Sequence, residues 1–120
     1  MIYIIDDDEI MAECIARACG EAQVRKYRDA IMAMQEIAEG EIPDLIMLDI
    51  LLDGPDGFTF LNELVSYADT AKVPVVVVSS LDLSGKDLSD YGVVGVLDKS
   101  KMVPQEIREY VLKYCGPVEK

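Results

Sequence analysis

Five short apolar runs recur along the chain, and each is typical of a buried β-strand. The run LIML at residues 45–48 is apolar at four consecutive positions, which indicates a strand covered on both faces, since neither face is left polar. Pro74 opens the run PVVVVS, where a missing backbone N–H costs least. The expected strands are residues 1–5, 24–27, 45–49, 72–79 and 93–97.

The segments between these runs carry apolar residues at helical spacing. Ile10, Cys14, Ile15 and Ala18 predict the inner face of a first helix, which Gly20 ends. The segment 81–92 has the weakest helical pattern, because its leucines stand among serines and a glycine, and we do not predict a full helix there. The expected helical segments are residues 9–19, 30–39, 58–68, 81–92 and a last one that begins at 104.

The second helical segment follows Asp29, which we expect to cap it. Its predicted inner face consists of Ala30, Met34, Ile37 and Ala38. We interpret the methionines at positions 32 and 34 as core filling rather than as a surface for a partner.

The alternation of strands and helices predicts a single α/β domain over residues 1–120, with a five-stranded parallel sheet and helices on both faces. An apolar fraction of 51% with 28% charged residues is typical of a soluble globular protein. The apolar runs are far shorter than the roughly 20 residues of a membrane span. Acids follow the first strand before a signal-peptide core could form, so we expect a cytoplasmic protein that does not bind membranes.

The balance of charged and reactive residues excludes several function classes. With 11 basic and 23 acidic residues the net charge is −12, which argues against direct nucleic-acid binding and favours a divalent cation. The chain has no histidine, so any phosphohistidine chemistry must place its histidine on another molecule. Cys14, Cys19 and Cys115 form no CxxC pair, and we interpret them as small buried thiols in a reducing compartment.

Polar residues gather at the ends of four expected strands. Because ligands of open parallel α/β sheets bind beyond the carboxyl ends of the strands, we expect these side chains to form one site. We interpret Asp8 and Asp98, which lie beside them, as turn formers or helix caps. The candidate site residues are Asp6, Asp7, Asp49, Ser79, Ser80 and Lys99.

Three neighbouring carboxylates need a cation among them. Two carboxylates about 5 Å apart repel by roughly 3 kcal/mol at an effective dielectric constant of about 20. Ligands that are all oxygen favour a hard ion, and Mg²⁺ fits them best. With Mg²⁺, Lys99 and Ser79 to stabilise phosphoryl oxygens, Asp49 could attack phosphorus and become an acyl phosphate.

Four segments in this order, IIDDDEI, LIMLDILLDGPDGF, PVVVVSS and GVLDKS, resemble the receiver domain of two-component response regulators over nearly the whole chain. The resemblance implies the strand order 2-1-3-4-5 and a sensor histidine kinase or phosphotransfer protein as phosphoryl donor. It implies a regulatory domain that catalyses only its own phosphorylation and dephosphorylation. Asp49 is similar to the phosphorylated aspartate, and Lys99 to the lysine that binds the phosphoryl group. Asp6 and Asp7 are similar to the acids that bind Mg²⁺, and Leu51 to the residue whose backbone carbonyl binds the metal. Ser79 is similar to the switch hydroxyl, and Ser80 to the small residue that keeps the site open.

The chain departs from the family at two residues that bear on switching. Ser100 stands where many receivers carry a cis-proline, and a trans bond is the default for a residue other than proline. Val96 replaces a frequent aromatic residue, and we interpret it as ordinary strand packing.

Two other functions stay open at this point. One is a receiver-like interaction module that works without phosphorylation. The other is a phosphatase with an aspartate nucleophile, although such enzymes place a second aspartate where this chain has Leu51.

Overall fold

The computed structural model describes residues 1–52, 56–81, 83, 85 and 87–116. Strands and helices alternate along the chain, as the apolar pattern predicted. None of the helices in these described ranges has the length and apolar character needed to cross a membrane. The elements are β1 (Ile2–Ile5), α1 (Glu9–Ala18), β2 (Val24–Tyr27), α2 (Ala30–Ala38), β3 (Leu45–Leu48), α3 (Gly57–Val65), β4 (Val75–Ser79), the 3₁₀ helix η1 (Ser89–Tyr91), β5 (Val93–Asp98) and α4 (Pro104–Cys115).

The sheet of the described chain is parallel throughout and has the order β2-β1-β3-β4-β5, which confirms the expected order 2-1-3-4-5. Ile5 at the end of β1 is level with Tyr27 of β2 and with Leu48 of β3. Ser79 at the end of β4 is level with Asp98 of β5. This register brings the residues that follow β1, β3, β4 and β5 to one edge of the sheet.

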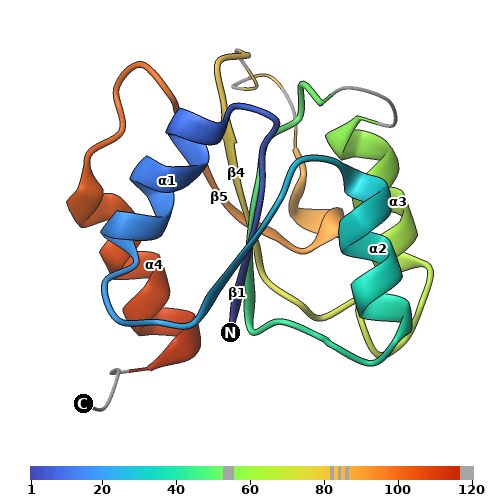
Figure 1. Cartoon of the computed structure of the whole chain (residues 1–120). Helices are drawn as coiled ribbons and strands as arrows, with labels where there is room; N and C mark the ends of the chain where they lie inside the picture. Colours follow the sequence, from blue (N-terminus) through green and yellow to red (C-terminus); the bar gives the residue numbers. More distant parts are fainter. Residues whose placement is uncertain (53–55, 82, 84, 86, 117–120) are drawn as a thin grey trace.

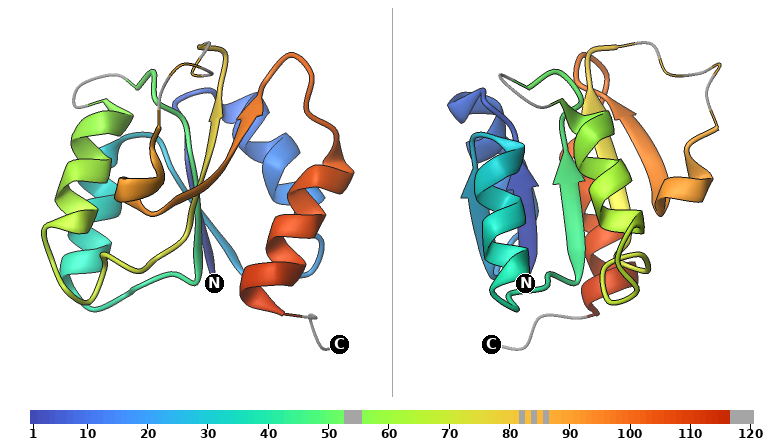
Figure 2. Two further views of the ribbon diagram at one scale, coloured as in Figure 1. Left: turned by 180° about the vertical axis from the view of Figure 1, so that it is seen from behind. Right: turned by 90° about the vertical axis from the view of Figure 1, so that its right-hand side faces the viewer.

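Helices cover both faces of the sheet, with α1 and α4 on one face and α2 and α3 on the other (Figure 1, Figure 2). Because successive strand residues point to opposite faces, each strand contributes to two cores. In β1, Tyr3 and Ile5 pack on the α2 and α3 side, whereas Ile2 and Ile4 pack on the α1 and α4 side. β1, β3 and β4 are buried along their whole length, so the prediction that the strand at 45–48 is covered on both faces is confirmed.

Aspartates fix where three helices begin. The side chains of Asp8, Asp29 and Asp56 accept hydrogen bonds of 2.8 to 3.0 Å from backbone N–H groups two or three residues further on. Such caps satisfy N–H groups that have no partner within the helix, and the negative charge suits the positive end of the helix dipole. Asp8 is therefore a helix cap, as expected.

The inner face of α1 differs from the expected one. Its buried residues are Ala12, Ile15 and Ala18, whereas Ile10 is 79% exposed and Cys14 faces the solvent. The sequence offers two apolar stripes on this helix, and the stripe with the smaller alanines lets α1 lie close to the sheet. The prediction that Cys14 is buried is therefore wrong.

The inner face of α2 also differs from the expected one. Ala30, Ala33 and Ile37 are buried, whereas Ala38 is exposed and Met32 is 50% exposed. The stripe at positions 30, 33 and 37 competes with the expected stripe and brings small alanines against the sheet. The interpretation of Met32 as core filling is therefore wrong.

The segment with the weakest helical pattern contains only the three-residue η1 among its described residues. Leu83 and Leu88 are nevertheless buried and belong to the core on the α2 and α3 side. In the following strand, Val96 is 45% exposed rather than packed as expected. Residues 82, 84 and 86 of this segment, and residues 53–55 of the expected loop after β3, lie outside the described residues.

Gly57 brings the start of α3 directly against the chain that follows β3. Its N–H donates a hydrogen bond of 2.9 Å to the carbonyl of Ile50. A Cβ atom at this position would lie 2.7 Å from the Cα of Ile50 and 2.8 Å from the carbonyl oxygen of Asp49. Both of these atoms belong to the backbone, so no flexible side chain could move aside, and the position requires glycine.

We expect Gly57→Ala to lower the free energy of unfolding by about 2 kcal/mol, because the added methyl group must displace backbone next to Asp49. Urea denaturation measures this loss. The matched control is Gly85→Ala, where an added Cβ meets nothing within 4 Å and the stability should change little. Equal losses in the two variants would contradict the close approach at Gly57.

Candidate functional site

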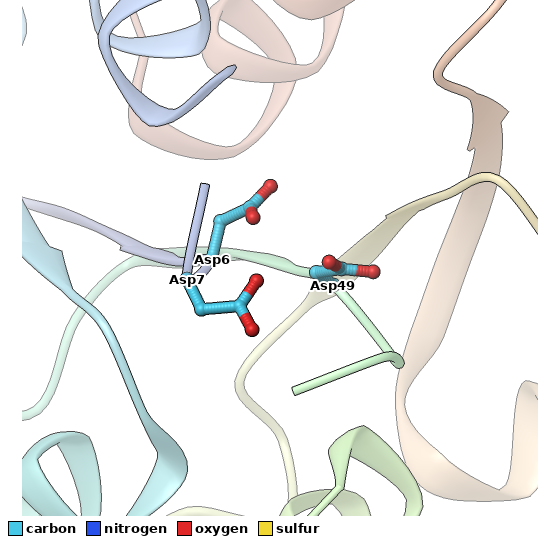
Figure 3. A group of neighbouring side chains, drawn as sticks. All are labelled: Asp6, Asp7 and Asp49. Carbon is cyan, nitrogen blue, oxygen red and sulfur yellow. The ribbon is translucent and has the colours of Figure 1, made fainter. Parts of the chain in front are cut away.

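The carboxyl edge of the sheet gathers the acids that the sequence analysis singled out. Asp6 follows β1, and its N–H donates to the carbonyl of Tyr27 at 3.0 Å. Asp49 follows β3, and its N–H donates to the carbonyl of Ile5 at 2.9 Å. These bonds continue the sheet by one residue, so the acids after β1 and β3 are held side by side, as Figure 3 shows.

Asp6, Asp7 and Asp49 each offer a carboxylate oxygen within 4.8 Å of the others. Asp6 is 2% exposed, Asp49 is 4% exposed and Asp7 is partly exposed. At this separation each pair of ionised carboxylates repels by roughly 3 kcal/mol with an effective dielectric constant of about 20. The three acids therefore form a small site of concentrated negative charge.

Lys99 lies between two of these carboxylates. Its Nζ is 2.9 Å from Oδ2 of Asp6 and 3.0 Å from Oδ2 of Asp49, and its side chain is only 16% exposed. Burial is the largest effect on the pKa of Lys99 and lowers it, but the close contacts with the carboxylates of Asp6 and Asp49, and the charges of these groups, together outweigh burial. The pKa of Lys99 is therefore raised, and the lysine stays charged.

The carboxyl group of Asp6 has a raised pKa. Burial raises the pKa of its carboxyl group, and the nearby charge of Asp49 adds to this, while the Asp8 N–H and Lys99 act in the opposite direction. Oδ1 accepts a hydrogen bond of 2.9 Å from the Asp8 N–H. Oδ2 is buried and contacts Lys99 as an ion pair rather than through an aligned hydrogen bond. This oxygen could therefore still accept a further donor or bind a cation.

The two serines at the end of β4 have different surroundings. Ser79 is 1% exposed, and its Oγ accepts a hydrogen bond of 3.2 Å from the N–H of Leu81. Its carbonyl accepts a hydrogen bond of 3.1 Å from the N–H of Lys99, which holds the backbone of the lysine beside β4. Ser80 is exposed. The buried hydroxyl thus lies at the end of the strand between those that carry Asp49 and Lys99.

Leu51 contacts Asp49 through its backbone. Its N–H donates a hydrogen bond of 3.1 Å to Oδ1 of Asp49, while its side chain is exposed. Together with Lys99 on Oδ2, this bond orients the carboxylate plane of Asp49.

The loop after Lys99 is closed by Asp98. Oδ1 of Asp98 accepts hydrogen bonds from the N–H and the Oγ of Ser100, at 2.9 and 2.7 Å. Asp98 is therefore a turn former, as expected. The described residues contain no cis peptide bond, so the bond between Lys99 and Ser100 is trans.

The donor set suits a hard divalent cation. Three carboxylates converge, all ligands are oxygen, and Oδ2 of Asp6 has no aligned hydrogen bond. Mg²⁺ binds through one or two carboxylates and keeps several waters, so these residues fit it.

The contact between Lys99 and Asp6 was not foreseen from the sequence, which suggested only a phosphoryl-binding role for Lys99. No sequence spacing indicates that contact, because it depends on how far the lysine side chain reaches across the end of β4.

The geometry defines a parallel α/β domain with a cluster of three acids and a lysine at its carboxyl edge. The chain belongs to the response regulator receiver domain family, whose model matches residues 2–112.

Two curated relatives are much longer than this chain. The chain is 28% identical to protein-glutamate methylesterase/protein-glutamine glutaminase 3 of Geobacter metallireducens, over 98% of the chain and 35% of that protein. It is 39% identical to the response regulator PleD of Caulobacter vibrioides, over 70% of the chain and 19% of PleD. The chain thus spans about a third of the first relative and about a fifth of the second.

Solved structures share the fold. The phosphorylated cyanobacterial phytochrome response regulator RcpA matches with a TM-score of 0.81 and 26% identity, over 95% of this chain and 92% of RcpA. The receiver domain of NtrX from Brucella abortus matches with a TM-score of 0.80 and 22% identity, over 95% of this chain and 97% of that one. At the latter identity the likeness concerns the fold alone.

We expect Asp6→Asn to raise the melting temperature of the metal-free protein by about 4 °C, which corresponds to roughly 1 kcal/mol. Because burial raises the pKa of Asp6, its ionised form opposes folding at neutral pH, and the neutral amide removes that cost. Mg²⁺ should stabilise the wild type, and the same variant should lose most of that stabilisation. Thermal unfolding with and without Mg²⁺ measures both effects.

The matched control is Asp8→Asn, which removes one charge next to the site but keeps an oxygen that caps α1. The melting temperatures of this control with and without Mg²⁺ should both stay close to those of the wild type. A lower melting temperature of Asp6→Asn without metal, or an undiminished response to Mg²⁺, would contradict the roles given to Asp6.

We expect Lys99→Met to lower the free energy of unfolding by about 3 kcal/mol near neutral pH, because Asp6 and Asp49 lose their shared cation. The raised pKa of Asp6 means that its protonation favours the folded state, so the loss should shrink as the pH falls toward the ordinary Asp value of about 4. Urea denaturation at several pH values tests this. The control Lys101→Met removes an exposed lysine, and an equal loss there would contradict the ion pairs.

Proposed function

We propose that this chain is the phosphoacceptor domain of a two-component system and that Asp49 takes a phosphoryl group from a phosphohistidine on a partner. The observation that carries the proposal is the position of Asp49, which lies against the Lys99 ammonium and within 4.8 Å of oxygens of Asp6 and Asp7. We further propose that residues 1–120 form one receiver domain.

In the proposed reaction a carboxylate oxygen of Asp49 attacks the phosphorus of the phosphohistidine. A P–O bond forms and the P–N bond breaks, its electron pair returning to the imidazole nitrogen of the partner, which takes up a proton. Lys99, 3.0 Å from Oδ2 of Asp49, is placed to pair with a phosphoryl oxygen once that carboxylate charge has become part of an acyl phosphate. Asp49 and Lys99 are thus the proposed catalytic residues.

Asp6, Asp7, Asp49 and the backbone carbonyl of Leu51 are the proposed Mg²⁺ ligands, with Asp6 acting through water. Bound Mg²⁺ would supply positive charge that lets an anionic carboxylate and an anionic phosphoryl group approach each other. The convergence of the three carboxylates supports this assignment.

Ser79 is the proposed switch residue. A hydroxyl group has one proton to donate and two lone pairs to accept hydrogen bonds. The Ser79 hydroxyl accepts a hydrogen bond from the N–H of Leu81. This bond does not use the hydroxyl proton, which Ser79 can therefore donate to a phosphoryl oxygen. A shift of Ser79 toward the phosphoryl group would then move the chain at Leu81, and the exposed Ser80 leaves room for it.

We propose that the domain is regulatory and catalyses only its own phosphorylation and dephosphorylation. The name of the methylesterase relative describes a protein about three times as long as the matched region. Leu51 stands where an aspartate-nucleophile phosphatase has its second aspartate, and its side chain has no proton to give a leaving group.

The proposed donor is a sensor histidine kinase or a phosphotransfer protein in the cytoplasm, because the chain has no histidine of its own. A protein partner would read the phosphorylated state. The net charge of −12 argues against direct contact with nucleic acid.

We expect Asp49→Asn to abolish labelling by phosphoramidate, a small donor with the P–N bond of phosphohistidine, while the fold stays intact. Intact-protein mass spectrometry measures the gain of one phosphoryl group, and hydroxylamine should remove it, since an acyl phosphate reacts with that nucleophile. Asp8→Asn serves as the control and should retain labelling. Label that persists in Asp49→Asn at the wild-type level would overturn the assignment.

A further inference from the structure

A groove lies between α2 and α3, away from the acidic site. These two helices run side by side on one face of the sheet (Figure 1, Figure 2). The groove has a volume of about 600 Å³, within the range of roughly 300–1,000 Å³ that ligand sites occupy. Its lining includes none of Asp6, Asp7, Asp49, Ser79 or Lys99, so the phosphoacceptor chemistry leaves it unexplained.

The groove combines a rigid apolar floor with exposed apolar walls. Phe60 and Ile37 belong to the protein core and form part of its lining. Ile31 from α2 is 53% exposed, and Tyr67 after α3 is 55% exposed. Met34 from α2 also lines the groove and is only partly buried, and methionine adapts well to different partners. Exposed apolar side chains that meet in one hollow mark a binding surface, whereas single ones do not.

The charges on the groove are all of one sign among the described residues. Glu63 and Asp69 line it, and the lining contains no lysine or arginine. Neither carboxylate has an ion-pair partner within the part of the chain that the structure describes. An occupant that brings positive charge to these two acids would therefore be complementary to the groove.

We propose that this α2–α3 groove binds an amphipathic helical segment of a partner protein, with an apolar face flanked by lysine or arginine. A helix fits because the groove lies between two helices, where apolar side chains at i, i+3, i+4 and i+7 can enter together. The basic side chains would pair with Glu63 and Asp69. A second copy of this chain is a poor occupant, because its net charge of −12 repels the acidic rim. This surface goes beyond the proposed phosphoacceptor function and does not depend on it.

The test uses a fluorescent synthetic peptide of about 18 residues, or five helical turns, with leucines on one face and lysines beside them. Fluorescence anisotropy measures its affinity for the whole chain without any phosphodonor, so the result does not depend on the reactivity of Asp49. Ile31→Lys should weaken binding at least about tenfold, because it places a like charge on the apolar wall. The matched control is Ile10→Lys, since Ile10 is also exposed but lies on α1, and its affinity should stay within about twofold of the wild type.

A second pair of variants tests the charges. Glu63→Gln should weaken binding, and Glu109→Gln, which removes an exposed acid from α4, should not. Amide chemical shifts should change on α2 and α3 when the peptide binds. Equal weakening by both lysine variants, or shifts centred on α1 and α4, would overturn the proposal in favour of non-specific attraction. Benzyltrimethylammonium is a small molecule that combines an apolar ring with a positive charge, and if it bound the groove as tightly as the peptide, the peptide assignment would be overturned. Self-association of the chain through the groove, measured by sedimentation, would also overturn it.

Discussion

The contact of one lysine with two buried carboxylates makes the acidic edge of the sheet possible. Lys99 follows β5, whereas Asp6 and Asp49 follow β1 and β3, so the lysine side chain must reach across the end of β4. The Lys99 N–H donates a hydrogen bond to the carbonyl of Ser79, which fixes the backbone from which the lysine side chain extends. Ser79, a small residue buried at the end of β4, thus holds through its carbonyl the backbone from which the lysine reaches the two acids.

The same contacts link stability to reactivity. A small domain has a net stability of only about 5–15 kcal/mol, so repulsion of roughly 3 kcal/mol for a carboxylate pair is a large fraction of it. Lys99 offsets part of this repulsion, yet burial, and to a smaller extent the charge of Asp49, keeps the pKa of Asp6 raised, which means that its ionised form remains costly. A site that keeps such a cost has a stronger attraction for added positive charge. This charge balance therefore supports the proposed binding of a cation and then of an anionic group that the cation and Lys99 would share.

The sequence predicted most of the fold because apolar runs and capping aspartates are local signals. It predicted that the acids after β1 and β3 meet at the carboxyl edge, because the ends of parallel strands share one edge. It did not predict which stripe of α1 faces the core, since Ile10 and Ala12 both begin plausible stripes and only packing against the sheet selects the alanines. It also missed the contact between Lys99 and Asp6, which joins residues far apart in sequence and depends on a side-chain conformation.

Of the described helices, α3 is the one that touches both the acidic edge and the α2–α3 groove. At its start, the Gly57 N–H donates a hydrogen bond to the carbonyl of Ile50, the residue after Asp49. The two backbone segments lie so close together here that there is no room for a Cβ atom. Further along, Phe60 and Glu63 line the groove. A packed helix moves as a unit more readily than it bends, so a shift of the chain at Ile50 would be transmitted to these residues. Coupling between the two surfaces requires that this contact adopt two discrete arrangements, and Gly57 is where the second one would have to form.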